Sequence, residues 1–147
     1  MKKLFCLLAV SCSVILFSQK SYSKISNSKI SQERVQISEQ FIKEYFTKCE
    51  NKDFSKFNNF ILDKRLERKL NENYEKNCEE SLQNNGKITI KKFNSAYLQD
   101  FTKDRDPIEY IVFDADFEKS KDLKFVSVWI YRDQNVISGI WISKEKP

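Results

Sequence analysis

Hydrophobic and polar positions alternate along three runs near the end of the chain, Ile108–Glu118, Leu123–Arg132 and Val136–Ser143. The runs are rich in Ile, Val, Phe, Tyr and Trp, and short polar stretches separate them, which is typical of antiparallel strands. In the first run Ile111, Phe113, Ala115 and Phe117 fall on one face. The pattern therefore predicts a half-buried antiparallel sheet.

The lengths of the polar turns predict how these strands pair. A four-residue turn at Lys119–Asp122 would place Phe113 opposite Val128, and a three-residue turn at Asp133–Asn135 would place Val128 opposite Ile140. Asn135 suits the left-handed backbone that such turns often need. With this register the aliphatic faces of all three strands coincide, as one buried face requires.

The same register gathers aromatic side chains on the other face of the sheet. Trp129 is expected to lie across from Gly139, and the face holds Tyr110, Val112, Phe125, Trp129, Tyr131, Ile137 and Trp141. Either another part of the chain or a second copy covers this face, or it binds a ligand or a partner, because large exposed aromatic patches usually mark interaction sites. The candidate binding or dimer surface is Tyr110, Phe125, Trp129, Tyr131 and Trp141.

Helical periodicity dominates the first half of the chain after the leader. An apolar stripe predicts a helix from Val35 to Cys49, Asp53 is a suitable N-cap for a short second helix, and a third helix is expected over Asp63–Gln83. Gly86 is expected to end the third helix with a left-handed residue.

Lys87–Phe101 then predicts a fourth, long strand. Its apolar residues change parity part-way, and a bulge at Lys91 and Lys92 would bring them to one face and bend the strand. These apolar residues are Ile88, Ile90, Phe93, Tyr97 and Phe101.

The N-terminus has the features of a secretory signal peptide. Lys2 and Lys3 precede an apolar run from Leu4 to Phe17, which is short for a membrane span and suits a signal-peptide core. We predict a signal peptide at 1–23, a flexible linker at 24–34, a single domain at 35–144, and a location in the periplasm or outside the cell. An uncleaved leader or a lipid on Cys12 would instead tether the chain to the membrane.

The charge and the cysteine content of the chain argue against nucleic-acid and metal binding and favour a disulfide-bonded domain. The formal charge of +5 falls by three lysines when 1–23 is removed, and no basic stripe of the kind that binds nucleic acid is present. Cys49 and Cys78 remain, and two cysteines in an exported domain most simply form one disulfide, with buried free thiols as the alternative. The chain has no histidine, so we expect neither a metal site nor another cofactor.

Helices followed by a four-stranded meander predict an α+β fold, with N-terminal helices packed on a curved antiparallel sheet. An amphipathic first helix, the Asp53-Phe54 step, a further helical pair and long bent strands resemble the nuclear-transport-factor-2-like superfamily of cone-shaped folds over about Val35 to Ser143. That resemblance implies an architecture and little about function, because the superfamily includes isomerases, dehydratases, secretion-system subunits and immunity proteins.

Enzymes of that superfamily typically hold an acid–base pair in the cavity between sheet and helices, and without histidine the candidates are carboxylates and tyrosines. Asp114 and Asp116 share a strand face, but the register turns that face away from the cavity. The tyrosines that could line it are Tyr45, Tyr74 and Tyr97. We therefore expect a non-catalytic exported domain that binds a protein partner, a second copy or a small apolar ligand. The alternatives are a structural subunit of an envelope assembly and, ranked after it, an enzyme of that superfamily with a carboxylate and tyrosine acid–base site.

Overall fold

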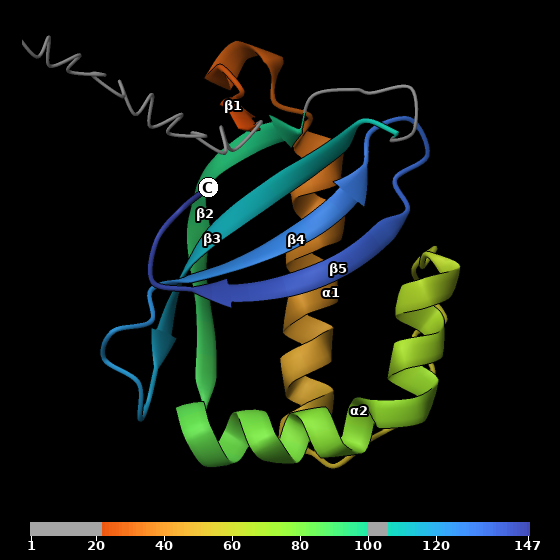
Figure 1. Ribbon diagram of the computed structural model, residues 1–147, viewed down its shortest axis with the longest axis vertical. Helices are drawn as coiled ribbons and strands as arrows, with labels where there is room; N and C mark the ends of the chain where they lie inside the picture. The colour runs from red at the N-terminus through yellow and green to blue at the C-terminus, as the bar shows by residue number, and fades with distance from the viewer. Residues whose placement is uncertain (1–21, 100–105) are drawn as a thin grey trace, which may run out of the picture.

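The computed structural model describes residues 22–99 and 106–147, and shows two helices packed against one open antiparallel sheet (Figure 1). The sheet has five strands in the order β1-β2-β3-β4-β5, one more than we predicted. The elements are β1 (Tyr22–Lys24), the 3-10 turn η1 (Asn27–Lys29), α1 (Gln32–Glu50), α2 (Lys64–Asn85), β2 (Ile88–Gln99), β3 (Ile108–Phe117), β4 (Phe125–Tyr131) and β5 (Ile137–Ser143).

The extra strand, β1, arises from residues that the sequence assigns to the leader and the linker. Tyr22 pairs with Gln99 and Lys24 with Tyr97, so β1 covers the free edge of β2. Segment 24–34 holds the end of β1, the turn η1 and the first turn of α1. The rest of the predicted signal peptide, including Cys12, lies outside the described residues.

Side-chain caps set the start of both helices. The Ser31 hydroxyl accepts a hydrogen bond from the backbone N–H of Arg34 at 3.3 Å, and the Asp63 carboxylate accepts one from Arg65 at 2.8 Å. Gly86 ends α2 with a φ of 67° and donates its N–H to the carbonyl of Leu82. Both predicted long helices are confirmed.

The short second helix was predicted wrongly. Residues 51–63 form turns, with a single bridge at Leu62. The Asp53 carboxylate caps a turn at Ser55 rather than a helix, and it also pairs with the ammonium of Lys48 at 2.9 Å. These polar bonds satisfy the backbone locally, while Phe57 fills the space between the helices.

Cys49 and Cys78 form a disulfide that joins the last turn of α1 to the second half of α2. The two residues are 29 apart in sequence and both are buried. Closing a loop of this length contributes roughly 3 kcal/mol by restricting the unfolded chain.

Two register shifts bend β2, one between Ile90 and Phe93 and the other between Phe93 and Ser95. The first agrees with the predicted bulge and keeps Phe93 in the main core. The second was not foreseen, and it turns Tyr97 to the opposite face of the sheet, where we had expected it to share the side of Phe93.

The C-terminal strands keep the predicted faces, with two corrections. Phe113 pairs with Val126, two residues away from the predicted partner Val128, because the loop between β3 and β4 is longer than four residues. A slip of two preserves which side chains face the core. Val128 pairs with Ile140 and Trp129 with Gly139 as predicted, and Asn135 has the expected positive φ of 52°.

The second correction concerns Ile137, which we had placed among the aromatic residues. An irregularity between Trp129 and Ile130 inserts one residue into the pairing, so Ile137 lies opposite Ile130 and is fully buried in the main core. The bulge therefore moves one apolar side chain from the outer face of the sheet to the face covered by the helices.

The main core lies between α1 and the concave side of the sheet; α2 is bent, so that its C-terminal part runs across the lower end while its N-terminal part stands upright beside the sheet (Figure 1). We call the side that packs on α1 the helix face and the opposite side the outer face. Among the described residues, no helix is long and apolar enough to cross a membrane.

Candidate functional site

The outer face carries a second, smaller apolar cluster. Tyr97, Tyr110 and Val112 are buried there, and Tyr22, Ile108, Phe125 and Trp129 pack against them. The rings of Tyr110 and Trp129 have centres 4.8 Å apart. Neighbouring strands supply these rings, so the rigid sheet fixes their positions.

The predicted surface residues are not equally placed on this face. Tyr110 is buried, Phe125, Trp129 and Tyr131 are half-buried, and Trp141 is 58% exposed. The indole ring of Trp129 lies over Gly139, as the sequence predicted, with an aromatic carbon 3.5 Å from the position that a Cβ would take. Trp141 is thus the member most available to a ligand.

Tyr22 completes the cluster and was missed by the sequence reasoning, which assigned it to the leader. Its hydroxyl lies 2.8 Å from that of Tyr110, and the two rings meet edge to face with centres 4.7 Å apart. Burial, followed by this hydrogen bond, raises the pKa of Tyr110 well above its usual value. At neutral pH the Tyr110 hydroxyl is therefore neutral and can both donate and accept.

A cavity of about 680 Å³ opens on this face. Its walls include Tyr22, Tyr110, Trp129 and Trp141 from the sheet, and residues 143–147 form its other side. These last residues return over the outer face (Figure 1), where the Lys146 ammonium lies 5.4 Å from the centre of the Phe125 ring and donates to the side chain of Asn94.

A second cavity, of about 500 Å³, follows β5 where it faces α2. Tyr131 lies here with Trp129 and Trp141, so the predicted surface is divided between two cavities, and Trp129 and Trp141 belong to both. Phe125 lines neither; it contacts the returning C-terminal residues.

Asp114 and Asp116 lie on the outer face, away from the helices. Asp114 accepts a hydrogen bond from Asn94 at 2.7 Å, and Asp116 is exposed and pairs with Lys91 at 2.6 Å. Both carboxylates thus have polar partners at the surface of the sheet.

The three tyrosines that the sequence offered as cavity residues lie on two different sides of the sheet. The Tyr74 hydroxyl donates to the backbone carbonyl of Tyr45 at 2.7 Å, and both rings pack around Phe57 in the main core. Burial raises the pKa of Tyr45 to about 12 and that of Tyr74 further. Tyr97 lies on the outer face instead. Tyr45, Tyr74 and Phe57 thus form a packed aromatic core.

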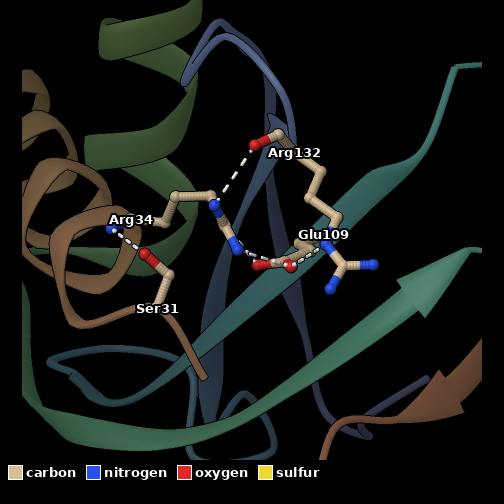
Figure 2. Close-up of polar contacts among 4 residues, drawn as sticks. All are labelled: Ser31, Arg34, Glu109 and Arg132. Atoms are coloured by element: carbon tan, nitrogen blue, oxygen red, sulfur yellow. Dashed lines mark hydrogen bonds and ion pairs between the residues drawn. The ribbon is translucent and has the colours of Figure 1, made fainter. Parts of the chain in front are cut away.

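A buried ion pair was missed by the sequence reasoning. Glu109 is 1% exposed and receives two hydrogen bonds from the Arg34 guanidinium, at 2.8 and 2.9 Å, while Arg132 approaches it at 3.4 Å (Figure 2). Its position was readable from the sequence, because Glu109 shares the parity of Ile111 and Phe113. Both carboxylate oxygens are engaged, so the group acts as a clamp between α1 and β3.

Among residues 22–99 and 106–147, no group of three or more His, Cys, Asp or Glu side chains could hold a metal ion. No family model, no curated protein and no solved structure matches the chain. The resemblance to the nuclear-transport-factor-2-like superfamily stays a prediction.

Proposed function

We propose that this protein is an exported, non-catalytic binding domain that holds a small, largely apolar ligand on the outer face of its sheet. The observation that carries the proposal is the cavity of about 680 Å³ between the aromatic residues and the chain end. Small-molecule sites typically enclose about 300–1,000 Å³ and are lined by apolar and aromatic groups with a few polar ones.

The chemistry of the cavity indicates the class of ligand. Trp129 and Trp141 offer flat apolar surfaces, and Tyr110 presents a neutral hydroxyl. Lys144 and Lys146 also line the cavity. A ring-containing apolar molecule with one polar or anionic group fits this combination, because rings stack on the indoles while the polar end meets hydroxyl and ammonium donors.

Trp141 supports binding rather than plain packing. A tryptophan that is 58% exposed leaves a large apolar area in water, whereas Tyr110 and Val112 on the same face are almost fully buried. A ligand on Trp141 would gain about 25 cal/mol for each Å² of apolar surface that it covers.

Export and the cone-shaped architecture form part of the same proposal. The Cys49–Cys78 disulfide agrees with an oxidising compartment such as the periplasm or the extracellular space. A non-catalytic role is supported by the carboxylates, since Asp114 and Asp116 face outward and Glu109 is held by two guanidinium groups.

Binding of the apolar dye anilinonaphthalene sulfonate tests the proposal. We expect Trp141→Ala to weaken dye binding by about tenfold or more, equivalent to about 1.4 kcal/mol. Ile61→Ala is the matched control, because Ile61 is 66% exposed but lies outside this cavity. Unfolding curves should be nearly unchanged for both variants, since neither side chain is buried.

Native mass spectrometry of the protein purified from the cell envelope distinguishes the occupants of the outer face. A reproducible small added mass that disappears in Trp141→Ala supports the ligand. A doubled mass that becomes single in the same variant would show that a second copy covers the face, and a retained leader or an added lipid would favour a membrane-tethered assembly subunit. Equal dye binding in the parent and in Trp141→Ala would contradict the proposal.

A further inference from the structure

The two edges of the sheet differ in how far another segment covers them. β1 covers the edge of β2 through three paired residues. Beyond β4, the opposite edge strand β5 forms a β-bridge with another described segment only at Ile137, which pairs in parallel with Leu62. The remainder of β5 has β4 on one side and no described strand on the other.

The direction of the backbone groups in β5 follows from those in β4. Ala115 donates its N–H to the carbonyl of Lys124, and Arg132 donates its N–H to the carbonyl of Pro107. These two bonds lie just beyond the two ends of β4, so the even-numbered residues between them direct their backbone groups toward β3. Tyr131 donates to Val136, so odd-numbered residues of β4 direct theirs toward β5.

Trp129 and Gly139 therefore form a hydrogen-bonded pair, and so do Ser127 and Trp141. Alternation then turns the backbone N–H and C=O groups of Ile140 and Ile142 away from β4, to the open edge. These groups can accept a sixth strand, whereas those of Gly139 and Trp141 cannot.

This edge lacks the usual protection against pairing. Natural edge strands commonly carry charged residues or proline, which discourage a further strand. From Ile137 to Ser143 the sequence ISGIWIS has neither.

The chain itself begins a strand here. Ile137 donates its N–H to Ile61 at 2.9 Å, and Asp63 donates to the carbonyl of Ile137 at 2.8 Å. The pairing of residues 61–63 with Ile137 ends where α2 starts. The next outward-facing backbone groups along β5 are those of Ile140 and Ile142, and they have no partner among the described residues.

The cavity of about 500 Å³ beside β5 has apolar side chains on both sides of the sheet edge. On the helix face it is lined by Leu66 and Leu70 of α2, and on the outer face by Trp129, Tyr131 and Trp141. A strand at this edge would direct one set of alternate side chains to the aromatic wall and the other set to the wall formed by α2.

The charged residues that line the cavity beside β5 indicate which kind of segment would bind there. Arg65 and Lys69 of α2 line the same cavity, and neither forms an ion pair with another described residue. The third charged group in the lining, Asp63, accepts a hydrogen bond from the backbone of Arg65. A second copy of β5 has no carboxylate to offer, so it would leave both cations unpaired, whereas an acidic segment would pair with them.

We propose that an extended segment of a partner protein, with alternating apolar and acidic residues, adds to the edge of β5 beside Ile140 and Ile142. Backbone hydrogen bonds supply affinity in this mode of recognition, and the side-chain pockets supply specificity. This site differs from the ligand cavity of the outer face, although Trp129 and Trp141 border both.

The test is amide hydrogen exchange followed by NMR on the full protein, with a synthetic peptide of alternating Val and Glu as the probe. At a peptide concentration of ten times Kd, exchange at Ile140 and Ile142 should slow by about tenfold. Gly139 and Trp141 amides should change little, because they already bond to β4. A peptide of alternating Val and Lys should bind at least about tenfold more weakly.

Two sets of variants separate the proposed contacts. The double variant Arg65→Glu with Lys69→Glu should reverse the preference between the two peptides, and both positions are exposed, so the fold should survive. Ile142→Pro removes one outward N–H and should abolish slowing at Ile140, whereas Ile142→Val keeps the N–H and should bind as the parent does.

Three results would overturn the proposal. The first is unchanged exchange at Ile140 and Ile142 at millimolar peptide. The second is an unaltered peptide preference in the charge-reversed variant. The third is slowing that depends on protein concentration without any peptide, which would make a second copy the occupant. Dye binding should remain normal in the charge-reversed variant, so failure of this site is distinct from failure of the ligand cavity.

Discussion

Arg34 and Glu109 form a two-pronged ion pair that joins the first turn of α1 to the start of β3. The Arg34 Nε and Nη2 atoms donate to the two carboxylate oxygens at 2.8 and 2.9 Å, and Glu109 is 1% exposed (Figure 2). The Arg34 guanidinium also donates to the backbone carbonyl of Arg132, which ties the β4–β5 turn to the same group. One side chain thus holds together three segments that are distant in sequence.

Removing one partner of this pair should destabilise the protein strongly. We expect Arg34→Met to lower the free energy of unfolding by about 3–5 kcal/mol, because it leaves a buried carboxylate with only the longer contact to Arg132. Urea denaturation measures the change. Lys43→Met is the control: it breaks an exposed pair with Glu39 and should cost about 1 kcal/mol or less. Similar losses in the two variants would show that the buried pair has no special role.

Loss of the disulfide should also destabilise the fold. The double variant Cys49→Ser with Cys78→Ser should lose about 2–5 kcal/mol, because the unfolded chain is no longer restrained. Thermal unfolding of the parent with and without reductant provides the matched comparison. Thiol alkylation of protein taken from the cell envelope checks the bond in place, and two free thiols there would contradict both the bridge and the export that it supports.

Alkaline pH should destabilise the protein through its buried tyrosines. Burial raises the pKa of Tyr45 to about 12, and raises those of Tyr74 and Tyr110 further. Above the ordinary tyrosine value of about 10 the unfolded chain loses these protons first, so stability present below pH 10 falls as the pH rises toward the folded pKa values. Each buried tyrosine contributes up to about 1.4 kcal/mol per pH unit to the slope.

Urea denaturation at a series of pH values from 9 upward tests this slope. Tyr74→Phe is the informative variant, because it removes one titrating group together with its hydrogen bond to Tyr45. It should be less stable than the parent at pH 9, and its stability should then fall less steeply with pH. Equal slopes would show that Tyr74 does not titrate differently in the folded and unfolded states.

The two glycines should respond differently to replacement by alanine. A Cβ at Gly86 would lie 2.7 Å from a carboxylate oxygen of Glu118, and the backbone there has a positive φ of 67°. Gly86→Ala should therefore cost about 1–3 kcal/mol. A Cβ at Gly139 would meet Trp129 at 3.5 Å, an ordinary contact, so Gly139→Ala should be nearly neutral. Thermal unfolding compares the two, and equal losses would contradict the account.

Much of the architecture follows from local pattern. The helix limits were predictable because Asp63 and Gly86 satisfy the end groups of α2 within a few residues of chain. The faces of β3 and β4 were predictable because alternation has a period of two, and even the slip in their register kept that parity. The pairing of Trp129 with Gly139 followed from a turn whose length and residues are local.

The sequence by itself therefore determined the α+β order, the two long helices and the sides of β3 and β4, because each depends on neighbouring residues. Only the tertiary structure decided the features that depend on distant contacts. A bulge moved Ile137 into the core, Tyr22 joined the sheet as a fifth strand, and Glu109 met Arg34 across the fold. Bulges form because tertiary packing favours them, and long-range ion pairs form because a buried charge needs a partner. The spacing of apolar residues along the chain does not indicate either of these contributions.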